Sequence, residues 1–270
     1  MTTPPEYEVY AIKYASREQA RSAHFIFDDP HDGPLAMDYY VWAIVGAGGT
    51  GGAGRRIVVD LGYDRRFARQ SRHLLRTPAE GLQLLGVDPL AVDDVIVTHL
   101  HYDHCGSLPD FAKSRIHIQD REMVFATGRF LKWKAFRYGN FVEYTVDFVR
   151  AIYDQRVDFV DGDAELAPGV SVHHLGGHTD GLQMVRVWTR RGWLVLASDA
   201  AHLYANMEIP NPYPAVFHVG DMLDGFNTLY RLADAPENVI PGHDPLVMQR
   251  YPAPSAELEG IVARLDADPI

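Results

Sequence analysis

Four residues that can bind a metal ion lie within six positions of the sequence, in the stretch THLHYDHCG. Imidazole and carboxylate groups are ligands that proteins use for zinc, iron, manganese and cobalt. The residues before and into this stretch, DDVIVTH, have the apolar composition of a short strand. His99 and His101 alternate at its end, so their rings point to one side, and Asp103 and His104 follow in the turn. The spacing predicts part of a metal site at a strand end.

One cluster of four ligands cannot complete two metal sites, because a tetrahedral metal ion needs about four ligands. Three more residues of the ligand type follow predicted strands: His178 in GGHTDG, Asp199 in LVLASDA and His243 in IPGHD. In open α/β sheets, ligands bind outside the carboxyl ends of the strands. We therefore expect these three residues to join the first cluster.

Strands dominate the rest of the sequence, and helices are interspersed among them. The segments EYEVYAIKY, YYVWAIVG, RRIVVDLG, GVSVHHL, LQMVRVW and WLVLASD are rich in β-branched and aromatic residues. A helix is expected after Thr77, with a proline in its first turn and a stop at Gly86, and another near the C-terminus in SAELEGIVARLDAD. This order predicts an α/β (α+β) protein, with two packed mixed sheets covered by helices.

Aromatic residues recur at roughly helical spacing between Thr127 and Tyr153. We expect a helical, aromatic-rich insertion near residues 127–155 of a single domain that spans residues 1–270. Most of these rings are expected to pack the insertion onto the domain, and a few to line an apolar substrate pocket or a subunit contact.

Composition excludes several classes of function. The 270 residues carry a formal net charge of −11, whereas a nucleic-acid surface normally shows a basic patch. No apolar run is long enough to cross a bilayer, and the N-terminal residues lack the pattern of a secretory signal. Cys105 is the only cysteine, so an internal disulfide is impossible. We expect a cytoplasmic enzyme without nucleic-acid or membrane partners.

The motifs HLHYDH, GGHTDG, the strand-end Asp199 and PGHD, in this order, resemble those of the metallo-β-lactamase superfamily. The strand and loop VVDLG, which contain Asp60, resemble the supporting motif that this superfamily carries before its histidine cluster. The resemblance implies the αββα four-layer sandwich, with the site at one edge of the two sheets.

The resemblance also implies two divalent metal ions, with zinc as the default. It assigns the seven ligands as follows: His99, His101 and His178 to the first ion, Asp103, His104 and His243 to the second, and Asp199 to both. Two ions lower the pKa of a bridging water and polarise a carbonyl group, which is the chemistry of a hydrolase. Asp103 is either a ligand alone or also the group that passes a proton to the leaving oxygen.

PGHD, GGHTDGLQM and DAAHLYANM, together with the aromatic insertion, resemble the N-acyl-homoserine lactonase branch. In that branch a tyrosine soon after the bridging aspartate donates a hydrogen bond to the lactone carbonyl. Here Tyr204 is the nearest tyrosine but stands slightly further along, and His202 lies between it and Asp199. Either residue is a candidate for the catalytic donor.

The leading hypothesis is a dinuclear hydrolase that opens a small-molecule lactone by attack of a metal-bridging hydroxide. The alternatives are hydrolysis of another ester, a thioester or an amide on the same scaffold, or a mononuclear iron oxygenase that uses two histidines and a carboxylate. A homodimer is possible through the aromatic insertion or the N-terminal strand region.

Overall fold

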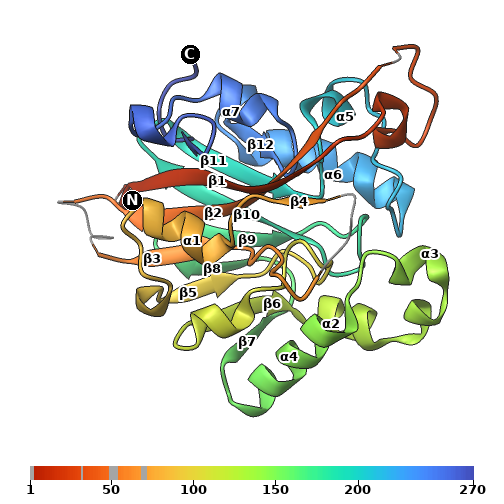
Figure 1. The fold of residues 1–270 in the computed structure, drawn as a ribbon, viewed down its shortest axis with the longest axis horizontal. Helices are drawn as coiled ribbons and strands as arrows, with labels where there is room; N and C mark the ends of the chain where they lie inside the picture. The colour runs from red at the N-terminus through yellow and green to blue at the C-terminus, as the bar shows by residue number, and fades with distance from the viewer. Residues whose placement is uncertain (1–2, 32, 49–53, 68–71) are drawn as a thin grey trace.

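The computed structural model describes residues 3–31, 33–48, 54–67 and 72–270, and two β-sheets form its centre (Figure 1). The first sheet has the order β13-β1-β2-β3-β5-β6-β7, and β4 pairs with β1. Its strands are β1 (Tyr7–Arg17), β2 (Met37–Gly46), β3 (Arg56–Val59), β4 (His73–Leu74), β5 (Asp94–Ile96), β6 (Arg115–Gln119), β7 (Val157–Val160) and β13 (Val262–Arg264). The second sheet has the order β12-β11-β10-β9-β8. Its strands are β8 (Ala164–Ala167), β9 (Val170–His174), β10 (Gln183–Thr189), β11 (Gly192–Ser198) and β12 (Val239–Pro241).

Strand β2 shows why the first sheet lies between two other layers. Tyr40, Trp42 and Ile44 belong to the apolar cluster that the two sheets share. The alternate residues Tyr39 and Val41 belong to a second cluster on the opposite face, with side chains from the helices. Because successive side chains of a strand point to opposite faces, a run that is apolar throughout is buried on both.

Helices cover the outer faces of both sheets. The α-helices are α1 (Pro78–Leu84), α2 (Asp120–Thr127), α3 (Lys134–Arg137), α4 (Val142–Tyr153), α5 (Tyr204–Glu208), α6 (Val219–Leu232) and α7 (Leu246–Arg250). The 3-10 helices are η1 (Arg21–His24), η2 (Pro89–Ala91), η3 (Leu108–Phe111), η4 (Arg129–Lys132), η5 (Pro236–Asn238) and η6 (Ala256–Leu258). Helices α1, α2 and α4 contribute to the outer cluster of the first sheet, and α6 and α7 pack against the second. The predicted four-layer αββα sandwich is confirmed. Among the residues that the structure describes, no helix is long and apolar enough to cross a membrane.

Helix α1 begins as the sequence predicts. The Thr77 side chain accepts a hydrogen bond from the backbone N–H of Glu80 at 3.2 Å, and the Glu80 carboxylate accepts one from the Thr77 backbone at 2.6 Å. This reciprocal capping satisfies N–H groups that have no partner inside the helix. Pro78 occupies the first helical position, where its missing N–H costs nothing.

The expected C-terminal helix is wrong. The segment forms only η6 and then β13, which pairs antiparallel with β1, for example Tyr10 with Arg264. Val262 and Ala263 are adjacent in sequence, and both are buried. Pairing with a strand from the other end of the chain outweighs the local helical tendency of this segment.

The aromatic segment is helical but broken into η4, α3 and α4. Figure 1 shows α2, α3 and α4 grouped beyond β6 and β7, with α3 at the margin of the molecule. Tyr144 and Phe148 are buried in the outer cluster of the first sheet, whereas Trp133 is 57% exposed. Some aromatic rings of this segment therefore pack the segment onto the first sheet, and others face solvent.

Candidate metal centre

The strand directions bring the ligand-type residues to one edge of the second sheet. Strand β10 runs antiparallel to both β9 and β11, and β12 runs parallel to β11. Strands β9, β11 and β12 therefore share one direction and end at the same edge. His178, Asp199 and His243 follow the ends of these three strands. The turn after β5, which carries the histidine cluster, meets them there.

Three overlapping groups of buried ligand-type residues form where these segments meet. Within each group, one ligand atom from every residue lies within 4.8 Å of the others. The groups are His99, His101, His178 and Asp199; Asp103, His104 and His243; and Asp199, His202 and His243. The structure thus brings together all seven residues predicted as metal ligands.

The carboxylate of Asp199 lies between the first two groups. Its Oδ2 atom is 3.2 Å from Nε2 of His178, and its Oδ1 atom is 3.1 Å from Nε2 of His104 and 3.0 Å from Nε2 of His243. One oxygen faces each group, which is the arrangement of a carboxylate that contacts two ions.

The protonation states of the first group suit a metal ion, whereas in the second group Asp199 and the other nearby carboxylates outweigh burial and raise the pKa of His104 and His243. Burial lowers the pKa of His99 and His178 well below the usual value and that of His101 to about 4, so these rings are neutral. Burial opposes ionisation of Asp199, but the surrounding histidines outweigh it and hold its pKa well below the usual value. Neutral imidazole and ionised carboxylate are the forms that bind metals.

One buried nitrogen atom tests the fit directly. Nδ1 of His99 lies 3.1 Å from the Thr98 hydroxyl, whereas its Nε2 atom is buried without a hydrogen-bond partner among the described residues. This Nε2 atom lies 3.8 Å from Asp199 Oδ2. A buried polar atom without a partner is costly unless it binds a ligand. The residues fit a metal ion.

Asp60 and Asp38 orient two of the rings. Nδ1 of His104 donates to Asp60 Oδ2 at 2.7 Å, and Nδ1 of His243 donates to the backbone carbonyl of Asp38 at 2.9 Å. The hydroxyl and backbone N–H of Thr98 also donate to Asp60, both at 2.8 Å. Each ring is thereby fixed with Nε2 toward the centre, as is usual for metal-binding histidines.

Glu122 in α2, which the sequence did not reveal, joins the two loops that carry the first group. Its carboxylate accepts hydrogen bonds from the Leu100 N–H at 2.8 Å, the Thr179 hydroxyl at 2.7 Å and the Gly181 N–H at 3.2 Å. Burial raises its pKa to about 7. The sequence feature that could have identified Glu122 is an acidic residue next to apolar residues on the inner face of a helix.

A pocket of about 160 Å³ opens onto the centre. Its lining comprises Arg17, Met37, Tyr39, Arg72, His101, Tyr102, Asp103, Phe125, Ala135, Phe136, Tyr138, Gly139, His178, Asp199, His202, Tyr213, Pro214, Ala215 and Val216. Phe136 and Tyr138 come from the aromatic segment, which lies directly against the site. The Tyr102 N–H donates to the Gly139 carbonyl at 2.8 Å, and a Cβ at Gly139 would come within 2.5 Å of the His101 ring.

Comparison with known proteins identifies the family. Residues 39–249 match the family model described as the metallo-beta-lactamase superfamily. The chain belongs to this superfamily. The match covers the whole second sheet and the first sheet except β1, β13 and the start of β2, and all seven ligand-type residues lie within it.

Curated relatives of this superfamily member include N-acyl homoserine lactonases. One from a Bacillus species is 28% identical over 133 residues, which are 49% of this chain and 48% of the relative. The AiiB lactonase of Agrobacterium fabrum is 31% identical over 178 residues, or 61% of each chain. The matched part thus spans about half to three fifths of these relatives' length.

Solved structures share the superfamily fold. A crystal structure of a quorum-quenching N-acyl homoserine lactone hydrolase has a TM-score of 0.71 at 21% identity, covering 90% of this chain and 94% of that one. A probable metal-dependent hydrolase from Staphylococcus aureus has a TM-score of 0.72 at 13% identity, covering 99% and 96%. At these identities the likeness concerns the fold.

The structure separates the two candidate donors of this superfamily member. His202 lines the pocket, its ring stacks on Tyr213 with centroids 3.8 Å apart, and its Nε2 atom is 3.0 Å from Asp199 Oδ2. Tyr204 does not line the pocket. It begins α5, and its buried ring faces α7, where the Arg250 guanidinium lies 3.9 Å from the ring centroid. Of the two candidates that the sequence left open, only His202 therefore lies on the wall of this pocket.

Cys105 has a packing role in the turn. Its thiol is buried and donates to the His101 carbonyl at 3.1 Å, while burial raises the pKa of the thiol well above the usual value. A thiol held in its neutral form is a poor metal ligand and nucleophile.

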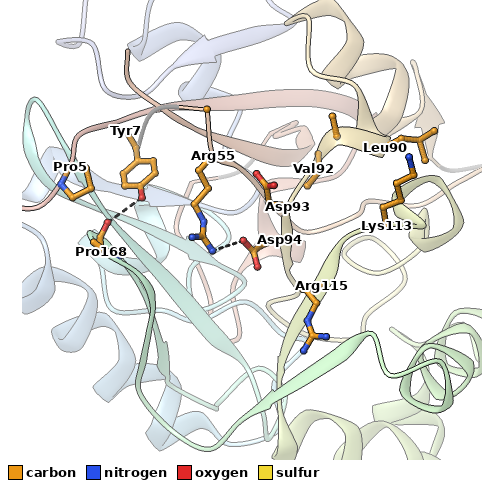
Figure 2. Close-up of a pocket in the computed structure, with 12 residues that line it drawn as sticks. Pro5, Tyr7, Arg55, Leu90, Val92, Asp93, Asp94, Lys113, Arg115 and Pro168 are labelled. Carbon is orange, nitrogen blue, oxygen red and sulfur yellow. Dashed lines mark hydrogen bonds and ion pairs between the residues drawn. The ribbon is translucent and has the colours of Figure 1, made fainter. Parts of the chain in front are cut away.

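A second pocket lies at the opposite end of β5, away from the ligand-type residues (Figure 2). Arg55 pairs with Asp94 at 2.7 Å in this pocket, and the Tyr7 hydroxyl donates to the Pro168 carbonyl at 3.1 Å. None of its carboxylates belongs to a group of metal-ligand type among the described residues. The candidate active site is the pocket at the metal centre.

Proposed function

We propose that this protein is a dinuclear metal-dependent hydrolase that opens a lactone ring. The position of Asp199 carries the dinuclear part, because its two oxygens face two separate groups of ligands. The relatives named as N-acyl homoserine lactonases support a lactone as the substrate.

Seven residues would hold the two ions. The first ion would take His99, His101 and His178, the second would take Asp103, His104 and His243, and Asp199 would contact both. Zinc is the proposed metal, because histidine nitrogens and carboxylate oxygens are its usual ligands in catalytic sites. When bound, two such ions supply an activated water near neutral pH and positive charge beside the scissile carbonyl.

His202 and Asp103 supply the remaining groups. Burial lowers the pKa of His202, so its ring is neutral and carries one N–H. Nε2 of the ring lies 3.0 Å from Asp199 Oδ2, and once that carboxylate holds the ions this N–H would be free to donate to the ring carbonyl, which is the role that we assign to it. Asp103 lines the pocket as well as belonging to the second group, so it faces both an ion and the substrate. We therefore assign to it the transfer of a proton to the leaving oxygen. The apolar rings of Phe125 and Phe136 exclude water from one wall.

The proposal includes the wider setting of the protein. We propose that residues 1–270 act as one catalytic domain with an insertion near 127–155, in the cytoplasm, and as a homodimer. The apolar cluster shared by the two sheets runs from Tyr7 to Leu265, which supports the single domain. Light scattering on the purified protein tests the dimer.

The proposed lactone hydrolysis is tested with metal-loaded protein. We expect ring opening in a panel of acyl-homoserine and aromatic lactones, measured by proton release and by a mass gain of one water. A chelator should abolish turnover and zinc should restore it, with two ions per chain by elemental analysis. Turnover of thioesters or phosphodiesters but of no lactone would contradict the proposal, as would one iron per chain with oxygen consumption.

A further inference from the structure

Two arginines line the pocket of a strongly acidic protein. The chain carries 36 acidic and 25 basic residues, yet Arg17 and Arg72 both face the cavity that holds Asp103 and Asp199. Arg17 ends β1, and Arg72 directly precedes β4. No reaction step assigned above uses either guanidinium group, so their presence requires its own explanation.

Arg17 lacks the partner that a half-buried cation normally has. Its Nε atom is buried and makes no hydrogen bond, and no carboxylate among the described residues pairs with its guanidinium group. The arginines of the second pocket differ: Arg55 pairs with Asp94 (Figure 2), and Arg115 pairs with Asp158. The buried Nε–H of Arg17 is thus available to an anion that enters the pocket, and such a bond would satisfy it.

Arg72 is held against the loop that carries the metal ligands. Its Nε atom donates to the Tyr102 hydroxyl, and its guanidinium lies 4.7 Å from the centroid of that ring. The Tyr102 ring in turn stacks on Phe67 at 4.0 Å, and its hydroxyl lies 3.1 Å from that of Tyr39. Tyr102 stands between His101 and Asp103 in sequence, so these contacts fix Arg72 relative to the centre. A guanidinium fixed in this way loses little freedom when it binds a carboxylate.

The space in front of the metal centre suits a compact group. Its volume is about 160 Å³. An engineered cavity of about 150 Å³ in another protein holds one benzene molecule. A single ring with a short substituent therefore fits between the centre and the two arginines.

We propose that the substrate is a compact lactone that carries a carboxylate, which Arg17 and Arg72 bind while the ring carbonyl lies at the metal centre. This rests on the proposed lactone hydrolysis and narrows it. The preferred substrate would then be an anionic lactone with a single ring, and not a neutral lactone with a long acyl chain.

Matched substrates test the charge. Metal-loaded protein is assayed with a five-membered lactone that bears a ring carboxylate and with the corresponding primary amide, which has a similar shape and no charge. We expect kcat/KM to favour the carboxylate by about 10- to 100-fold, as charged hydrogen bonds allow. Arg17→Met and Arg72→Met should each remove most of this preference, and Arg17→Lys should retain part of it.

Arg190→Met is the matched control. Arg190 follows β10, at the end of the second sheet away from His178, and its side chain is 53% exposed. This variant should keep the full preference for the carboxylate. A wild-type preference for the amide, or an unchanged ratio in Arg17→Met, would overturn the proposal.

Binding without turnover separates the two proposals. Calorimetry with the opened product, a hydroxy dicarboxylate, should show at least tenfold tighter binding to the wild type than to Arg17→Met, and Arg17→Gln is used if that variant fails to fold. If this difference appears but no lactone is hydrolysed, lactone hydrolysis fails and the carboxylate site stands. If neutral lactones are hydrolysed and the dicarboxylate binds both proteins equally, the carboxylate site fails alone.

Discussion

At the scale of single residues, the site depends on which nitrogen each histidine turns toward the centre. Asp60 and the Asp38 carbonyl each take the Nδ1 proton of one ring, and His99 is left with a buried Nε2 atom that has no partner among the described residues. The hydrogen-bond acceptors around each ring thus determine which of its nitrogen atoms is free to bind a metal ion. The presence of a histidine does not determine this by itself.

His202→Phe tests the proposed carbonyl donor. The variant keeps a ring against Tyr213 but removes the N–H, so we expect kcat for lactone opening to fall about 100-fold with little change in KM. Tyr204→Phe should lower kcat less than about twofold, because that ring faces Arg250. Steady-state kinetics at equal metal content measure both effects, and a larger loss in the tyrosine variant would reverse the assignment.

From the sequence, the ligand-type residues that meet at the centre could be selected more easily than the other residues around them. His99, His178 and His243 follow apolar strands, so local pattern and residue type were enough to select them. The choice between His202 and Tyr204 depended on where α5 begins and how it faces α7, which no local pattern encodes. The same holds for Arg17, because the lack of a partner becomes visible only when its neighbours in space are known.

At the scale of elements, α2 connects loops that belong to different sheets. Glu122 receives hydrogen bonds from Leu100, in the turn after β5, and from Thr179 and Gly181, in the loop after β9. These loops carry three of the four residues of the first ligand group. The helix is therefore part of the support of the metal centre as well as of the outer layer.

Glu122→Gln should weaken the first metal site. The amide N–H groups of the new side chain would face the N–H and O–H groups that now donate to the carboxylate, so the two loops should separate. We expect the affinity for metal, measured by competition with a chelator, to be about tenfold lower. Glu143→Gln is the control, because Glu143 lies exposed in the first turn of α4. Equal metal affinity in the wild type and both variants would show that the carboxylate has no such role.

At the scale of the whole molecule, the ligand-type residues at the centre come from both sheets. His99 and His104 follow a strand of the first sheet, whereas His178, Asp199 and His243 follow strands of the second. Ions bound here would hold the two layers together at one edge. Only the folded chain brings these residues together, so metal binding should stabilise the native state.

Metal loading should therefore raise the unfolding temperature. At a free zinc concentration of 1,000 times Kd the stabilisation is about 4 kcal/mol, and for a chain of this size that corresponds to a rise in Tm of roughly 10 °C. Scanning calorimetry with zinc or with a chelator measures the shift, and His104→Ala should reduce it. The same Tm under both conditions would contradict a link between the sheets.

The pairing of β1 with β13 has a consequence for synthesis on the ribosome. Strand β1 gains its outer neighbour only when Val262–Arg264 leaves the exit tunnel. Until then one edge of β1 offers unpaired N–H and C=O groups over these residues, which other nascent chains can also bind. Completion of this sheet must therefore wait until the chain has been translated from β1 through β13, and during that interval the open edge favours association between nascent chains.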